Sequence, residues 1–236
     1  MRVKIVYVFH NCFALMFNDK VLVFDYPELL DEKVRDFVRN IVRNKELLVM
    51  ISHSHMDHFS KEFLKLKNYA KRFTCIISRD VGEVCNDAGK QCREVSEGEE
   101  LSLDGILIKV LESSDLGVSY FLKMNDLKVY FAGDNSDWRR PSLPKEFNKI
   151  IWRTFSRVVE ELRRDISKLD VLFANLCVEC NDYGGLGKLC KTFNPKLLVP
   201  MHLRGNIEVL KQLSSFLKQL ASTVFLYERT GDNIVI

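Results

Sequence analysis

The segment 52–58, with the sequence SHSHMDH, contains three of the chain's five histidines and an aspartate. Imidazole nitrogens and carboxylate oxygens are ligands for zinc and similar metals. In extended backbone His53 and His55 point to the same side, so both can reach one ion. Asp57 and His58 lie past a turn and reach a second position more easily. The pattern therefore predicts a metal site, and the alternative is a solvated turn with incidental histidines.

Strand ends are expected to position this segment and two further polar residues. The apolar run 46–51 precedes the histidines as a buried strand, and Ser60 follows them as the N-cap of a predicted helix. Asp134 follows an apolar run and Gly133, which permits a tight turn. His202 follows the apolar run 197–201. Two alternatives stay open at this point, a plain turn role for Asp134 and a structural role for His202.

The rest of the chain alternates apolar patterns with turn residues. No linker or low-complexity stretch interrupts it, which predicts one domain over residues 1–236. The order of elements permits two sheets between helices or one doubly wound sheet. Predicted strands cover residues 3–9, 12–17, 20–24, 47–51, 73–78, 93–95, 100–103, 106–111, 118–123, 128–132, 171–175, 196–200, 223–226 and 233–236, and predicted helices cover 31–44, 61–69, 80–87, 147–166, 186–192 and 207–220.

Composition narrows the class of protein. The hydrophobic fraction is 47% and the charged fraction 28%, which is typical of a globular protein, and no apolar run reaches the roughly 20 residues of a membrane span. A net charge of +3 does not favour a nucleic-acid partner. Seven scattered cysteines predict no disulfide framework and a reducing cytoplasm. Cys177 and Cys180 are expected as structural or free thiols, with a redox or minor metal role as the alternative.

Three motifs together resemble a known family. His53-x-His55-x-Asp57-His58 is similar to the signature of the metallo-β-lactamase-fold hydrolases, and the later motifs 132–134 and 200–202 match that family in order and spacing. The resemblance covers nearly the whole chain and implies an α+β fold of four layers, αββα, with two mixed β-sheets sandwiched between helices. It implies one metal site formed by Asp57, His58, Asp134 and His202, and another formed by His53, His55 and the bridging Asp134.

One family motif is missing. The family places another histidine before a Gly-Ser-x-x-Tyr-like strand, whereas this chain has Ser113 near that place and Asp115 as the nearest good ligand. An uncharacterised branch of zinc-dependent relatives is similar in this segment. The site of His53 and His55 is then completed by Asp115, weak or empty, and these alternatives stay open. Asp25 is expected to orient a ligand, and His10 is either a proton donor in the cleft or an ordinary loop histidine.

The resemblance also implies a function. A bound metal lowers the pKa of water to about 7, so the expected activity is hydrolysis of an ester-like or phosphoester-like small molecule, with Asp57 and His58 as catalytic residues. One or two zinc ions are expected, and iron or manganese suits the same ligands. One alternative is a non-catalytic or mononuclear module that binds a metal or an anion. Another is a nuclease, supported by the mild positive charge and by Arg139-Arg140.

Overall fold

The computed structural model describes residues 2–236, which pack as two compact units, each built on a seven-stranded mixed sheet. Unit 1 contains the described residues up to Val95, with Arg204–Ile207 and Tyr227–Ile236, and unit 2 contains Ser96–Leu203 and Glu208–Leu226. The α+β class and the two mixed sheets are confirmed. The single domain stays a prediction.

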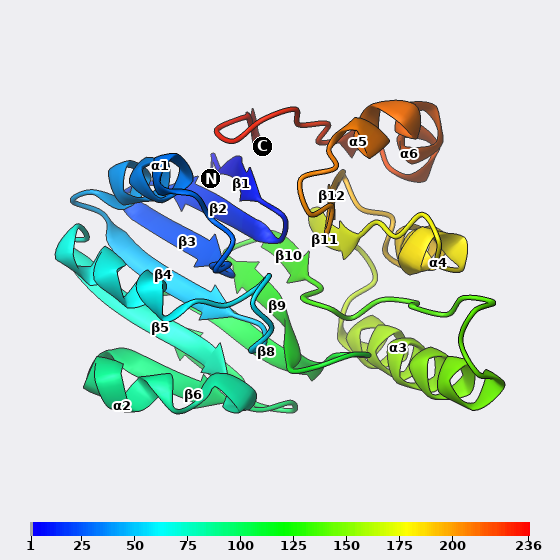
Figure 1. The fold of residues 1–236 in the computed structure, drawn as a ribbon, viewed down its shortest axis with the longest axis horizontal. Coiled ribbons are helices and arrows are strands. Elements are labelled where there is room, and N and C mark those ends of the chain that lie inside the picture. The colour runs from blue at the N-terminus through cyan, green and yellow to red at the C-terminus, as the bar shows by residue number, and fades with distance from the viewer. Residues whose placement is uncertain (1) are drawn as a thin grey trace. The chain divides into compact units, whose positions relative to one another are not determined.

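The sheet of unit 1 combines an antiparallel part with a parallel part. Strands β14, β1, β2 and β3 pair antiparallel, and β3, β4, β5 and β6 pair parallel (Figure 1). Parallel neighbours need a crossover, and helical segments supply it between β3, β4 and β5. In the order of the sheet, the strands are β14 (Asn233–Val235), β1 (Lys4–Phe9), β2 (Cys12–Phe17), β3 (Lys20–Phe24), β4 (Glu46–Ile51), β5 (Arg72–Ser78) and β6 (Cys92–Val95).

Helical segments cover one face of this sheet. Asp31 caps the first helix by accepting a hydrogen bond from the amide of Val34. Ser60, the predicted N-cap, accepts one from the amide of Glu62 in the next helical segment. Apolar side chains of these helices join one hydrophobic cluster with alternate strand residues. The helical segments are α1 (Glu32–Val42), the 3₁₀ segments η1 (Lys61–Asn68), η2 (Arg79–Val81) and η3 (Gly89–Gln91), and α2 (Val84–Ala88).

The sheet of unit 2 also combines an antiparallel part with a parallel part. Strands β7 to β10 form an antiparallel meander, and β10 to β13 pair parallel. The crossovers are helices, as in unit 1. The strands are β7 (Glu100–Leu103), β8 (Ile106–Glu112), β9 (Val118–Met124), β10 (Leu127–Phe131), β11 (Val171–Asn175), β12 (Leu197–Met201) and β13 (Thr223–Val224), and the helices are α3 (Lys145–Asp165), α4 (Asp182–Phe193), α5 (Glu208–Gln212) and α6 (Ser214–Leu220).

Helix α4 begins with a left-handed turn. Gly184 and Gly185 have φ angles of 88° and 85°, and a Cβ atom on Gly185 would lie 2.4 Å from Cζ of the buried Phe155 in α3. Regular helix follows, as predicted for 186–192. The predicted helix 207–220 was too long, because it is interrupted between α5 and α6, and the predicted helix 80–87 is likewise split into η2 and α2.

Two disulfide bonds contradict the expectation of no disulfide framework. Cys75 and Cys92 lie directly opposite each other on the parallel strands β5 and β6, and Cys177 is joined to Cys180 in the loop after β11. Sequence spacing did not reveal the first pair, because only the register of β5 against β6 brings residues 17 positions apart together.

Candidate metal centre

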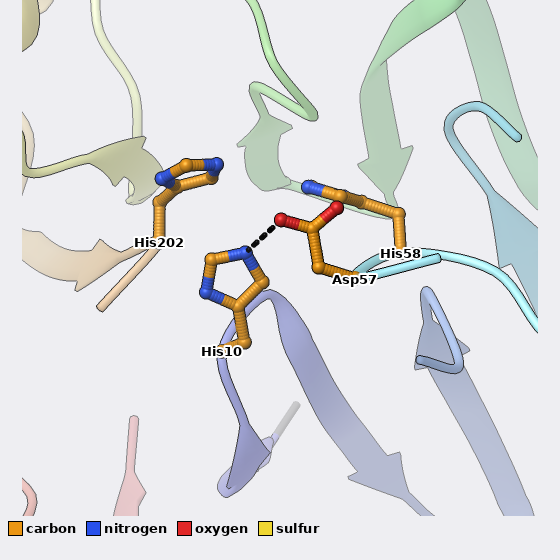
Figure 2. Close-up of side chains that lie close together, drawn as sticks. All are labelled: His10, Asp57, His58 and His202. Carbon is orange, nitrogen blue, oxygen red and sulfur yellow. Dashed lines mark ion pairs between the residues drawn. The ribbon is translucent and has the colours of Figure 1, made fainter. Parts of the chain in front are cut away.

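Three side chains of unit 1 converge where β1 ends and the histidine-rich segment begins. His10, Asp57 and His58 each offer one ligand atom, and these atoms lie within 4.8 Å of one another. His10 and His58 are completely buried, and Asp57 is 7% exposed. Figure 2 shows the ring of His10 turned toward the Asp57 carboxylate, with Nε2 and Oδ2 3.4 Å apart. The arrangement gathers two imidazoles and one carboxylate in a largely buried place.

His53 and His55 lie beside this group. Their ring centroids are 4.7 Å apart, and the centroids of His53 and His58 are 4.0 Å apart. His53 is completely buried whereas His55 is exposed. The two ring nitrogens offered by His53 and His55 lie within 4.8 Å of each other, so both side chains are able to reach one ion.

A single buried carboxylate, Asp25, contacts His58 directly and His53 through Ser52. Asp25 follows β3, is fully buried and has a left-handed backbone with φ 50°, which aspartate tolerates better than most residues. Its Oδ2 accepts a hydrogen bond from Nδ1 of His58 at 2.7 Å and another from the Ser52 hydroxyl at 3.0 Å, while Oδ1 accepts one from the Ser52 amide at 2.8 Å. The Ser52 hydroxyl oxygen in turn lies 2.9 Å from Nδ1 of His53.

This network sets the tautomers of His53 and His58. A carboxylate only accepts, so Nδ1 of His58 carries the proton. The Ser52 hydroxyl donates to Asp25 and therefore accepts from Nδ1 of His53. In both neutral rings Nε2 then keeps its lone pair for a ligand. Burial raises the pKa of Asp25, and the contacts with His58 and Ser52 counteract that rise.

His10 has the opposite tautomer. Its Nδ1 accepts a hydrogen bond from the backbone amide of Arg204 at 3.0 Å, so Nε2 carries the proton and faces Oδ2 of Asp57. A proton on Nε2 makes His10 a hydrogen-bond donor here and not a metal ligand. The contact with His10 is the largest cause that holds the pKa of Asp57 well below its usual range, and the positive charge of Arg204 adds to it. Asp57 is therefore an anion.

Unit 2 supplies its own pair of donors at the ends of β10 and β12. Asp134 follows Gly133, whose φ of 52° makes the predicted turn, and His202 has a left-handed backbone with φ 70°. Oδ1 of Asp134 lies 3.5 Å from Nε2 of His202. Asp134 is 4% exposed, and the ring of Trp138 packs against that of His202 with centroids 5.0 Å apart.

Several hydrogen bonds hold the turn that carries Asp134. The Trp138 indole donates to the Asp134 carbonyl oxygen at 2.8 Å, and the Asn175 amide donates to the Gly133 carbonyl oxygen at 2.8 Å. The Ser114 hydroxyl donates to the Ser136 carbonyl oxygen at 2.6 Å. The turn is thus tied to β11 and to the segment before β9, and none of these partners had a recognisable signal in the sequence.

Three other residues named in the sequence prediction, Ser113, Asp115 and Arg139, do not belong to these groups of donors. Ser113 is buried and accepts a hydrogen bond from the amide of Asp115, whose side chain is exposed. Among the described residues, no group of metal donors includes Asp115, and its role as a ligand stays a prediction. Arg139 binds the buried Asp137 through two nitrogens and stacks 4.0 Å above Trp152, so it is a structural residue and not a free cation for a nucleic acid.

The donors present fit a metal ion of the zinc class. They are imidazole nitrogens and carboxylate oxygens, Asp25 orients the ring of His58 directly and that of His53 through Ser52, and the Asp57 carboxylate is ionised. Sequence reasoning missed Ser52, although it lies inside the motif, because serine is not a metal ligand. It also missed Arg204, which is 147 residues from Asp57 in the chain.

Comparison with solved structures shows the fold. Igni18, a novel metallo hydrolase from the hyperthermophilic archaeon Ignicoccus hospitalis, is 18% identical, with 100% of this chain and 99% of that chain covered and a TM-score of 0.70. YhfI, a metallo-beta-lactamase fold protein from Bacillus subtilis, is 14% identical, with 100% and 99% covered and a TM-score of 0.65. CmlA, a diiron beta-hydroxylase from Streptomyces venezuelae, is 13% identical, with 99% and 54% covered and a TM-score of 0.64.

Three further findings concern the class of protein to which the chain belongs. No curated protein matches it. Within residues 2–236, the helices are all too short or too polar to cross a membrane. The model of the beta-lactamase superfamily domain matches residues 4–146, well over half of the 236 residues and the part that carries the histidine-rich segment and Asp134. The chain therefore belongs to the beta-lactamase superfamily.

Proposed function

We propose that the protein is a metal-dependent hydrolase that cleaves an ester-like or phosphoester-like bond in a small molecule. The observation that carries the proposal is the network of Asp25, in which one buried carboxylate orients the ring of His58 directly and the ring of His53 through Ser52. Such outer hydrogen bonds are typical of histidines that bind metals. A merely structural histidine has no need for a fixed lone pair.

The proposal assigns the donors of both units to two metal positions. Membership of the superfamily supports this assignment, as does the position of each donor just after a strand of its sheet. Zinc is the first expectation, and the diiron relative CmlA is a reason to include iron in any assay. One position consists of His53, His55 and Asp134, and the other of Asp57, His58, Asp134 and His202.

The residues of the chain have distinct roles in this proposal. Bound metal ions would supply a water molecule with a pKa near 7 and polarise the substrate. Asp57 stays ionised because His10 donates to it, and Asp25 keeps the rings of His53 and His58 in one orientation. The Nε2 proton of His10 lies next to Asp57, where it is able to donate to a developing negative charge.

Metal content and turnover test the proposal together. Protein purified without a chelating tag would be analysed for metal by plasma mass spectrometry and then assayed on chromogenic esters, phosphomonoesters and phosphodiesters with zinc, manganese and iron. We expect about two metals per chain, fewer in Asp134→Ala, and turnover of at least one class that is lost in Asp57→Ala. Absence of turnover in metal-loaded wild type, with intact folding, would refute the hydrolase.

A mononuclear binding module is the second candidate. It is supported by Ser113, which stands near the place of the family's missing histidine, and by the exposed position of Asp115. This candidate predicts one metal per chain and no change in metal content in Asp115→Ala. A fall from two metals toward one in Asp115→Ala would support the complete dinuclear site instead. The cytoplasmic location and the small size of the substrate stay predictions.

A further inference from the structure

Arg204 is attached to the candidate metal centre by both its backbone and its side chain. The backbone amide donates to Nδ1 of His10 at 3.0 Å, and Nη2 of the guanidinium lies 2.7 Å from Oδ2 of Asp57. All three residues belong to unit 1. Arg204 is therefore built into the same hydrogen-bond group that holds Asp57.

The backbone of Arg204 is held in a conformation that costs free energy. Its φ angle is 46°, in the left-handed region, and Gly205 follows with φ 82°. A left-handed backbone is unfavourable for a residue with a Cβ atom, and such residues concentrate at functional sites. The conformation is what allows the amide and the guanidinium of one residue to reach His10 and Asp57 at the same time.

Most of the Arg204 side chain is nevertheless open to solvent. Its side chain is 69% exposed, whereas that of Asp57 is 10% exposed. A guanidinium has five N–H donors in a planar fork, and the contact with Asp57 is made by one nitrogen. An exposed ion pair of this kind adds little to stability, so its position needs another explanation.

We propose that Arg204 binds an anionic group of the substrate, and that the substrate carries a phosphate next to the bond that is cleaved. The arginine fork matches the oxygens of a phosphate group in two-point hydrogen bonding, and a neutral ester offers no such partner. The contact with Asp57 aims the fork at the candidate metal centre. This inference rests on the proposed function and narrows it to phosphoesters.

Titration with inorganic phosphate tests the inference without turnover. Isothermal calorimetry on metal-loaded protein would compare wild type with Arg204→Gln and with Arg229→Gln, a matched control because Arg229 of unit 1 is also an exposed arginine next to an aspartate. We expect phosphate to bind at least tenfold more weakly to Arg204→Gln and equally to Arg229→Gln. Unchanged binding in Arg204→Gln, or no binding to wild type, would overturn the inference.

Two substrates with the same leaving group distinguish recognition of a phosphate by Arg204 from an effect of Arg204 on Asp57 alone. We expect the ratio of kcat/KM for p-nitrophenyl phosphate to that for p-nitrophenyl acetate to fall at least tenfold in Arg204→Gln, with metal content unchanged. Equal losses on both substrates together with lower metal content would mean that Arg204 acts only through Asp57. If wild type hydrolyses neither these substrates nor a phosphodiester, the proposed function fails, and the phosphate titration still decides the role of Arg204.

Discussion

Replacing Asp25 by asparagine should weaken metal binding by His53 and His58 without unfolding the protein. Asparagine has the same shape and also tolerates the left-handed backbone at this position. The backbone amide of Ser52 is a fixed donor to Oδ1, so the asparagine must place its carbonyl oxygen there and its NH₂ group where Oδ2 was. Nδ1 of His58 and the Ser52 hydroxyl then face a donor.

Both histidines have to change tautomer to satisfy this new donor. His58 would accept at Nδ1 and carry its proton on Nε2, and the Ser52 hydroxyl would turn and donate to Nδ1 of His53. The proton on each Nε2 then occupies the position of a metal. Loss of such an outer partner typically weakens metal binding 10–100-fold, or about 1.4–2.7 kcal/mol.

Competition with a chromophoric chelator would measure the metal affinity, and long-range ¹H–¹⁵N spectra would identify the histidine tautomers in metal-free protein. Asp31→Asn is the matched control, because Asp31 is exposed and asparagine is an equally good N-cap. A metal affinity of Asp25→Asn within twofold of wild type, with its thermal unfolding unchanged, would refute the tautomer argument.

Three further changes should affect stability in ways that the structure specifies. Gly185→Ala and Gly105→Ala both place alanine at a φ near 85°, but only at Gly185 does the new Cβ meet a ring carbon at 2.4 Å. In urea unfolding, Gly185→Ala should therefore lose about 1–3 kcal/mol more of its unfolding free energy than Gly105→Ala. Burial raises the pKa of Tyr130 to about 12, so this tyrosine should contribute a loss of about 2 kcal/mol to wild type between pH 10 and 12, where the unfolded chain releases the proton and the folded chain keeps it, and urea unfolding of Tyr130→Phe should show a loss smaller by that amount. A variant with Cys75→Ser and Cys92→Ser should lose about 3 kcal/mol in calorimetry because the closed loop spans 17 positions, and a reductant should destabilise this variant by that much less than wild type, since only the bond between Cys177 and Cys180 remains to be reduced.

The sequence indicated the elements well where local patterns decide them. The apolar run before His53, the cap at Ser60 and the turn at Gly133 depend on residues close in the chain, and the structure contains each of them. Helix ends were less accurate, because the break between α5 and α6 does not interrupt the apolar spacing.

The supporting contacts of the site were beyond sequence reasoning for a different reason. Residues that bind metals have a recognisable chemistry, whereas Ser52, Trp138 and Asn175 act through ordinary hydrogen bonds that many loops contain. Arg204 and His10 meet only through the folded chain. Asp25 was identified as an orienting residue, but that it serves His53 as well as His58 emerged only from the geometry.

The long separation of Arg204 from its partners has a consequence for the order of events on the ribosome. Its contacts with His10 and Asp57 span 194 and 147 positions. At roughly 5–20 residues per second, on the order of ten seconds pass between the synthesis of Asp57 and that of Arg204. His10 and Asp57 are thus made well before the arginine that contacts them. A nascent chain presents metal-binding side chains to the cell before it has any means of holding an anion there.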